Sequence, residues 1–301
     1  MFPIIPAGSA AESGNQEGIF GFGWDGSNYV SMTNLVSNAG VVGADVTGVG
    51  TARRYGAACE YGEDKGIFGF GQTGSGYVGM TNLVTNAGVV GTDVTAVGTG
   101  RRYIGACSFG GDKGIFGFGN AGSVNDITNL VSNSGVVASD VTGVGTARHA
   151  IAGCEYGDDK GILGFGDDGT QRVSITNLVS NSGVVASDQA ATTGTARGYL
   201  AACSFGGDKG IFGYGEDGNI NVSMTNLVSN AGVVASDVTG VGSARYYLGA
   251  TQYGGDKGIF GYGYTDTYVS MTNLVTNAGV VGTDVTGVGT DRAGPAACSF
   301  N

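Results

Sequence analysis

One arginine and one aspartate recur at fixed positions along this 301-residue sequence, and they offer its most regular chemistry. The planar guanidinium group of arginine is a fork of hydrogen-bond donors that fits a carboxylate. Two roles stay open: a structural role in every repeat, as an Arg–Asp pair or bonded to the backbone, which we favour, or a ring of six guanidinium groups that binds an anion. The arginines are Arg53, Arg101, Arg148, Arg197, Arg245 and Arg292, and the aspartates are Asp45, Asp93, Asp140, Asp188, Asp237 and Asp284.

The residues that most enzymes use for acid–base or nucleophilic chemistry are scarce. His149 is the single histidine, which leaves Ser-His-Asp, Cys-His and multi-histidine copper chemistry almost without material. Acids in the variable loops offer a carboxylate pair for glycoside hydrolysis, but exposed loop acids are commonly just solvated. We therefore predict no catalytic residue. The loop acids are Asp25, Asp167, Asp168, Glu216 and Asp217.

The cysteines all occupy one repeat position, where Thr251 stands in the remaining copy. One small residue per repeat indicates a packing role, because five equivalent thiols cannot all pair. A metal site needs converging ligands, and the repeated Gly-Asp-Lys turn offers too few oxygen atoms for calcium. We predict no metal and no cofactor. The cysteines are Cys59, Cys107, Cys154, Cys203 and Cys298.

These residues belong to a unit of 47–49 residues that recurs six times. Periods of this length indicate a solenoid, a propeller or an array. In the unit at 52–98, β-branched and aromatic runs between Gly and Asn predict strands at 56–61, 66–71, 78–85 and 89–94. Four antiparallel strands per unit are typical of a propeller blade. The motif Gly-Ile-(Phe/Leu)-Gly-(Phe/Tyr)-Gly opens at Gly18, Gly66, Gly114, Gly161, Gly210 and Gly258.

The two ends of the chain complete one unit between them. Residues 1–13 contain nothing like a first strand, whereas PAACSF at 295–300 matches IGACSF at 104–109. Residues 293–301 should therefore close the first blade, and such closure protects strand edges that an open repeat would expose. We predict an all-β fold: a six-bladed β-propeller of four-stranded antiparallel blades over 14–301, preceded by an N-terminal arm at 1–13.

Residues 18–301 resemble the kelch repeat in the order of an arginine, a small apolar strand, a glycine-flanked aromatic strand, a variable loop and two further strands. The paired glycines of that family stand here as Gly-Phe-Gly or Gly-Tyr-Gly, and its late tryptophan is missing, since Trp24 lies in a loop. The resemblance implies that the connection between blades lines a binding face. Units of the TNLVSNAGVV type also look like repeats of phage and environmental viral proteins.

Composition excludes two classes of function. Nucleic-acid binding needs basic surface, and this chain has a formal net charge of -11 with 14 lysines and arginines. No apolar run approaches the length that spans a bilayer, so we expect no membrane insertion. An acidic, weakly charged surface suits glycan or protein partners.

Variation among the six copies is concentrated in the second-to-third-strand loop and in the residues that follow the repeated arginine. Both segments emerge on one face of a blade, which predicts a recognition face, because aromatic side chains on rigid loops suit recognition. Unconstrained loop drift is the alternative interpretation. The predicted binding residues are Trp24, Asp25, Tyr29, Tyr55, Tyr77, Tyr103, His149, Tyr199, Tyr247, Tyr264 and Tyr268, with Tyr246 near them.

We expect a non-enzymatic recognition or structural module, such as a tail or capsid-associated protein of a phage virion. Its variable face would bind a protein assembly or a cell-surface glycan, and the arm at 1–13 would attach it to a larger particle. A viral protein of this kind would lie on the virion surface. Two alternatives stay open: a multivalent lectin or adhesin, whose repeated weak sites gain avidity, and a glycoside hydrolase at the axial mouth.

Overall fold

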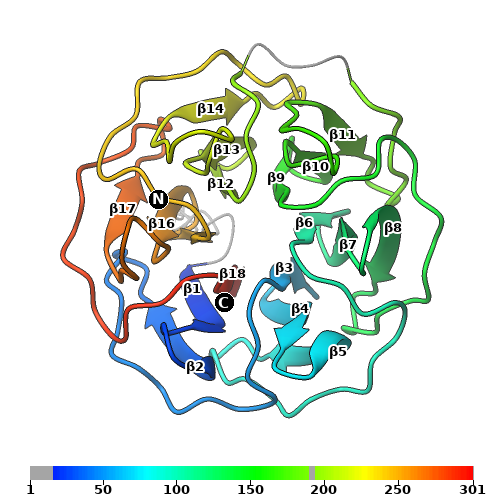
Figure 1. Cartoon of the computed structure of the whole chain (residues 1–301), viewed down its shortest axis with the longest axis horizontal. Helices are drawn as coiled ribbons and strands as arrows, with labels where there is room; N and C mark the ends of the chain where they lie inside the picture. The colour runs from blue at the N-terminus through cyan, green and yellow to red at the C-terminus, as the bar shows by residue number, and fades with distance from the viewer. Residues whose placement is uncertain (1–15, 190–193, 301) are drawn as a thin grey trace, which may run out of the picture.

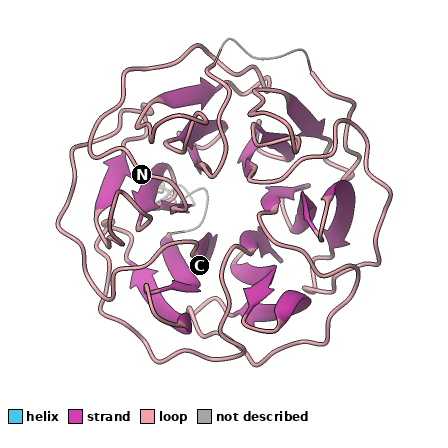
Figure 2. Cartoon of the chain, in the orientation of Figure 1, coloured by secondary structure: helices cyan, strands magenta, loops and turns pink. Residues whose placement is uncertain are grey.

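A computed structural model describes residues 16–189 and 194–300 of the chain. In this part the chain is all-β: eighteen strands form six antiparallel sheets of three strands each, and no helix is present (Figure 2). The sheets stand around a common centre in a propeller-like arrangement (Figure 1). The predicted N-terminal arm, 1–13, lies outside the described residues.

We number the sheets in chain order and write each from its innermost strand outwards. Sheet 1 is β18 (Ala296–Phe300), β1 (Glu17–Trp24) and β2 (Tyr29–Val36); sheet 2 is β3 (Ala57–Tyr61), β4 (Lys65–Thr73) and β5 (Gly76–Val84); sheet 3 is β6 (Gly105–Phe109), β7 (Lys113–Asn120) and β8 (Val124–Val131). Sheet 4 is β9 (Ala152–Tyr156), β10 (Lys160–Gly164) and β11 (Thr176–Val179); sheet 5 is β12 (Ala201–Phe205), β13 (Lys209–Gly213) and β14 (Thr225–Val228); sheet 6 is β15 (Gly249–Tyr253), β16 (Lys257–Gly261) and β17 (Thr272–Val275).

The strands predicted first, second and third in each unit are present, but the fourth is reduced to two isolated bridges. In the unit of sheet 2 these bridges join Val84 to Val90 and Thr81 to Val94. The side chain of Asn82 explains the interruption, since its Nδ2 donates to the carbonyl of Gly91 at 3.0 Å. That carbonyl lies between the two bridges and is satisfied by a side chain.

The C-terminal strand completes sheet 1, as the two chain ends predict. β18 pairs antiparallel with β1, from Glu17 opposite Phe300 to Gly21 opposite Ala296. Innermost strands touch their neighbours in an unbroken cycle, β3, β6, β9, β12, β15 and β18, with β18 next to β3 again. The molecule therefore depends on a pairing between the two ends of its sequence.

Apolar side chains fill the space between neighbouring sheets, and glycines make room for them. Ile67 and Phe70 of sheet 2 are fully buried in one cluster with Phe116 of sheet 3. A Cβ atom on Gly69 would lie 2.7 Å from the Phe116 ring, and one on Gly258 would lie 2.6 Å from the sulfur of Cys203. The repeated glycines of the second strand are thus required by the side chains of the adjacent sheet. The five cysteines are buried and unpaired, as their single repeat position predicts.

Deleting residues 295–301 should open the molecule, because β18 would be lost and the edge of β1 would be exposed. We expect the shortened chain to aggregate or to lose cooperative unfolding in urea, followed by Trp24 fluorescence. Adding a peptide of residues 293–301 should restore the midpoint and serves as the control. A shortened chain with an unchanged midpoint and no response to the peptide would contradict this role of β18.

Candidate functional site

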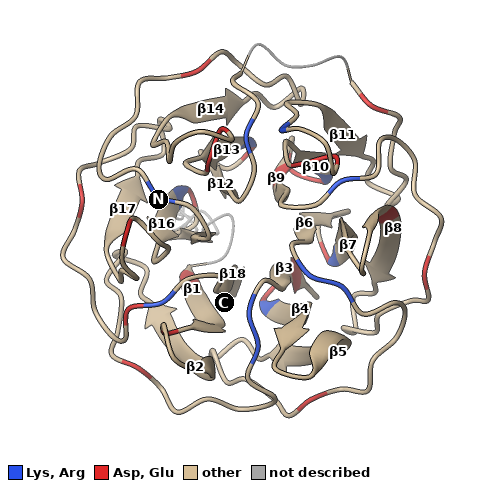
Figure 3. Cartoon of the chain, viewed as in Figure 1, with Lys and Arg blue, Asp and Glu red and all other residues tan. Residues whose placement is uncertain are grey.

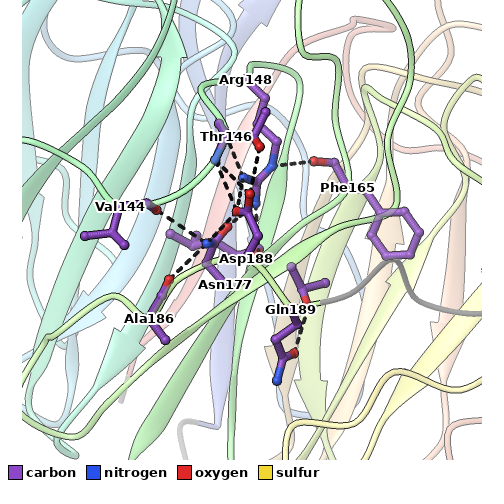
Figure 4. A network of polar contacts seen from close by, with 10 residues as sticks. Val144, Thr146, Arg148, Phe165, Asn177, Ala186, Asp188 and Gln189 are labelled. Atoms are coloured by element: carbon purple, nitrogen blue, oxygen red, sulfur yellow. Dashed lines mark hydrogen bonds and ion pairs between the residues drawn. The ribbon is translucent and has the colours of Figure 1, made fainter.

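The six repeated arginines are buried, with exposed fractions of 2% for Arg53 and 0% for the other five. Their nearest polar side chain is an asparagine, which the sequence did not identify as the partner. In sheet 4, Arg148 Nη2 donates to Asn177 Oδ1 at 2.6 Å, and Arg148 Nε donates to the carbonyl of Phe165 at 2.9 Å (Figure 4). The partner asparagines are Asn82, Asn129, Asn177, Asn226, Asn273 and Asn34, in the order of Arg53 to Arg292.

The repeated aspartate lies beyond this asparagine. It accepts hydrogen bonds from the asparagine and from the segment that leads to the repeated arginine. Asp188 Oδ1 accepts a bond from Asn177 Nδ2 at 3.0 Å, and its Oδ2 accepts from the Thr146 hydroxyl at 2.7 Å (Figure 4). The gap from Arg148 Nη1 to Asp188 Oδ1 is 3.8 Å, an ion pair without a short hydrogen bond. We call this set of four residues, Arg, Asn, Asp and Thr, the latch; Ser243 replaces threonine in one copy.

An aromatic ring of the preceding sheet closes each latch. The Arg148 Cζ atom lies 4.2 Å from the centre of the Phe118 ring, and Phe118 itself has a φ of 61°. A bulky residue in this left-handed region is strained, and here it sits at a bulge between Gly117 and Gly119 that turns its ring towards the next sheet. Phe22, Phe70, Phe165, Tyr214 and Tyr262 repeat this geometry.

The latch geometry supports the structural role of the arginines and does not support an anion-binding ring. Their guanidinium groups are buried, and that of Arg148, for example, is enclosed by an asparagine, two carbonyls and a ring, which leaves no face open to a ligand. Burial lowers the pKa of Arg148 to about 10 although Asp188 acts in the opposite direction, and the group stays charged at neutral pH. The predicted Arg–Asp pair is present as an ion pair of 3.8–3.9 Å in five of the copies, and the asparagine between the two side chains makes the shorter hydrogen bonds.

On the face that carries the variable loops, a ring of backbone hydrogen bonds surrounds the centre. Six residues, one per sheet, are joined N–H to O=C in a closed cycle of 2.7–3.0 Å, and each has a φ of 55–67°. Four of them bring the predicted tyrosines together, and Tyr55 and Tyr247, for example, have ring centres 4.7 Å apart. The six are Tyr55, Tyr103, Ala150, Tyr199, Tyr247 and Gly294.

Further predicted residues continue this aromatic cluster outwards. His149 lies against Tyr103 with ring centres 5.6 Å apart. Tyr246 touches Tyr264 at 5.7 Å, and Tyr264 touches Tyr268 at 5.0 Å. The structure therefore brings most of the predicted residues into contact on one face, which we call the variable-loop face.

The remaining predicted residues lie at the edge of the variable-loop face. Trp24 and Tyr29 form an edge-to-face pair at 4.8 Å. Tyr77 is 36% exposed. Asp25 instead holds its own loop, since its carboxylate accepts the backbone N–H groups of Ser27 and Asn28 at 2.7 and 2.6 Å. Of the predicted set, Asp25 has the clearest local structural role.

Three arginines of this face were missed by the sequence analysis. Arg54 and Arg102 follow latch arginines, and Arg172 lies between β10 and β11. Each guanidinium stacks on tyrosine, at 4.5 Å for Arg54 over Tyr55, 4.7 Å for Arg102 over Tyr103 and 4.9 Å for Arg172 over Tyr199. The sequence signal for Arg54 and Arg102 was a second arginine directly after Arg53 and Arg101, where the other copies have unrelated residues. Basic residues lie nearer the centre than the acidic residues of the outer loops (Figure 3).

Buried polar side-chain atoms without a partner are also gathered on this face. Among the described residues they belong to Arg54, Arg102, Asn125, His149 and Arg172. Buried donors and acceptors without a partner are costly and rare in folded proteins, so each of them needs an explanation. Burial lowers the pKa of His149, although Asp167 acts in the opposite direction. The variable-loop face therefore combines buried polar atoms that lack a protein partner with a floor of aromatic rings.

A second polar cluster lies on the axis, between the innermost strands. It lines a cavity of about 40 Å³ that includes Glu60, Ser108, Glu155, Ser204 and Gln252. Burial raises the pKa of Glu60 despite hydrogen bonds from Ser299 and Ser108. Burial, followed by the nearby Glu60, raises the pKa of Glu155 to about 8. Within the described residues, no group of three or more His, Cys, Asp or Glu could hold a metal ion.

Comparison with known proteins does not assign the chain to a family. A scan against protein-family models and a search of curated proteins found no match for the chain. In the described part of the chain, no helix is long and apolar enough to cross a membrane. The case for function therefore rests on the two clusters described above.

Replacing Asn177 with alanine should destabilise the protein by about 3–5 kcal/mol, because buried Arg148 would lose its side-chain acceptor. The matched control is Asn181→Ala in the exposed turn after β11, where only a bond to Asp159 is lost and less than about 1 kcal/mol is expected. Urea unfolding measures both. Equal midpoints for the two variants would contradict a stabilising latch.

Replacing Glu155 with glutamine should help stability more at high pH than at low pH. A carboxyl whose folded-state pKa is raised contributes fully below its ordinary pKa of about 4.3, and this contribution is lost as pH rises through about 8. The variant lacks that loss, so its advantage over the natural chain should grow between pH 5 and pH 9 to about 1 kcal/mol or more.

Urea unfolding at five pH values between 5 and 9 measures this difference. Val184→Ala, which removes no titratable group from an exposed turn, is the control and should give a difference that does not grow with pH. A constant difference for Glu155→Gln would show that this carboxyl titrates alike in the folded and unfolded chain.

Proposed function

We propose that the six sheets are the blades of a closed six-bladed propeller, and that this propeller is a non-enzymatic recognition module. Its variable-loop face binds the ligand, and a saccharide is the class of ligand that the face suits best. Tyrosine and tryptophan rings offer flat apolar surface for the C–H face of a sugar, while neighbouring polar groups form hydrogen bonds with its hydroxyl groups. The observation that carries the proposal is the joining of aromatic rings and orphaned polar atoms on one face.

The rigidity of the base supports recognition. The residues of the closed backbone ring sit directly beside the latch arginines, so the tyrosines project from backbone that is bonded on both sides. A preorganised aromatic face loses little side-chain entropy on binding. The same construction lets loop sequences vary without loss of the fold.

The axial mouth is a poor place for hydrolysis. Its ring of backbone carries four tyrosine side chains, and Tyr103 and Tyr247 stack across it at 5.9 Å. Two of the predicted loop acids are engaged, because Arg172 pairs with both Asp167 and Glu216. A glycoside hydrolase needs one free nucleophile or base and one proton donor, so this arrangement favours binding over catalysis.

A structural place in a larger assembly is the second candidate, and one observation favours it. In every unit the turn after the third strand exposes a valine by 60–64%. Apolar residues repeated around a rim are suited to contact with other proteins. Stoichiometric presence of the chain in a purified particle, such as a virion, is the measurement that tests this role. These valines are Val41, Val89, Val136, Val184, Val233 and Val280.

Saccharide recognition is tested with a glycan array, read with and without calcium. We expect specific hits, and we expect the triple variant Trp24→Ala, Tyr29→Ala, Tyr268→Ala to lose them by at least about tenfold, since these rings supply contact area. Val41→Ala, Val89→Ala and Val233→Ala together form the control on the exposed turns and should keep the hits. An array without any specific hit would sink the saccharide proposal.

A further inference from the structure

Among the lysine and arginine side chains of the described residues, that of Arg54 has no polar partner. The six latch arginines are enclosed, and each of the five lysines bonds to the aspartate that precedes it. Arg172 pairs with two carboxylates, and Arg102 Nη1 donates to Gln72 Oε1 at 2.7 Å. No side-chain hydrogen bond or ion pair among the described residues reaches Arg54, and its Nε is buried without a partner.

Three aromatic rings hold the Arg54 guanidinium in place. Its Cζ lies 4.8 Å from the centre of Trp24, 5.3 Å from Tyr29 and 4.5 Å from Tyr55. Trp24 and Tyr29 come from sheet 1, whereas Arg54 and Tyr55 lead into sheet 2, so the cluster sits between two blades. The rings fix the position of the charge through cation–π contact and leave its N–H groups unbonded.

The adjacent inter-blade position is a near copy in which the charge is capped. Gln72, Tyr77, Arg102 and Tyr103 stand where the first position has Trp24, Tyr29, Arg54 and Tyr55. Arg102 stacks on Tyr77 at 5.0 Å, as Arg54 does on Tyr29. The decisive difference is tryptophan in place of glutamine, which replaces a hydrogen-bond acceptor with a flat ring. The protein thus carries one open and one capped version of the same cluster.

We infer that Arg54, with Trp24 and Tyr29, binds the carboxylate of an acidic saccharide. A guanidinium with free N–H groups fits a carboxylate in bidentate fashion, and the aromatic rings beside it fit a sugar. Ser27 and Asn28 are exposed on the loop between Trp24 and Tyr29 and offer partners for hydroxyl groups. The formal net charge of -11 opposes long-range attraction of an anion, so binding depends on these short-range contacts. This inference rests on the saccharide recognition proposed above and narrows it.

Titration calorimetry on the full chain tests the inference with trigalacturonate and 3′-sialyllactose as acidic probes. Lactose and the methyl ester of trigalacturonate are the neutral counterparts. We expect at least one acidic probe to bind with one site per chain, at least tenfold more tightly than its neutral counterpart. Binding of trigalacturonate alone would indicate a hexuronate ligand, and binding of sialyllactose alone would indicate a nonulosonate ligand.

Substitutions at the two copies of the cluster locate the site. Arg54→Gln should lower the affinity for the acidic probe at least tenfold, and Trp24→Gln should do the same, because the new amide would cap Arg54 as Gln72 caps Arg102. Gln72→Trp should free Arg102 and raise the stoichiometry from one to two. Lys65→Gln, which removes one positive charge at the opposite end of β4, is the control and should leave the affinity unchanged.

The possible failures are distinguishable. Unchanged affinity in Arg54→Gln, with an unchanged thermal midpoint, would overturn the site. Equal binding of acidic and neutral probes would overturn the acidic ligand while saccharide recognition stands. Absence of binding by every saccharide on the array would overturn the proposed function and this inference with it.

Discussion

The structure depends on a buried positive charge between each pair of neighbouring sheets. An arginine with no exposure is costly unless its donors are satisfied, and here an asparagine, two carbonyls and an aromatic ring satisfy it from two sheets at once. These contacts form together only when the two neighbouring sheets are correctly aligned with each other. The latch therefore gives specificity to an assembly whose strands are short and whose outer strands are incomplete.

The cost of the latch appears as backbone strain. The aromatic residue in contact with each arginine has a left-handed backbone. All six residues of the axial ring are left-handed too, and five of them carry a side chain. Such conformations persist only where the surroundings over-determine them. In this chain the bulge turns the ring onto the arginine, and the axial residues are held by two hydrogen bonds to their neighbours. Most of this strain thus lies at the end of the sheets that carries the variable loops, and Glu63 and Asp158, in turns at the opposite end, are the exceptions.

The sequence predicts the sheets well and their connections less well. Regular glycine and β-branched spacing identifies three strands per unit and the pairing of β18 with β1. The sequence does not identify Asn82 or its equivalents as the partners of the arginines, because the motif TNLV predicts only a strand. The fourth strand is overestimated for the same reason, since this asparagine takes a carbonyl in the middle of the predicted pairing. Side-chain bonds over nine or more residues have no local signature.

The variable-loop face shows why the distribution of charge is more informative than its total. A net charge of -11 opposes polyanion binding over a broad surface, yet it says nothing about one arginine that lacks a partner. Arg102 and Arg54 occupy equivalent positions, and the residue in the preceding sheet decides whether the guanidinium is capped by Gln72 or flanked by Trp24. A single exchange in a loop can therefore switch a site on or off while the latch below it stays unchanged. Repetition of the scaffold makes such exchanges independent of the fold, which is the physical basis for the recognition role that we propose for this face.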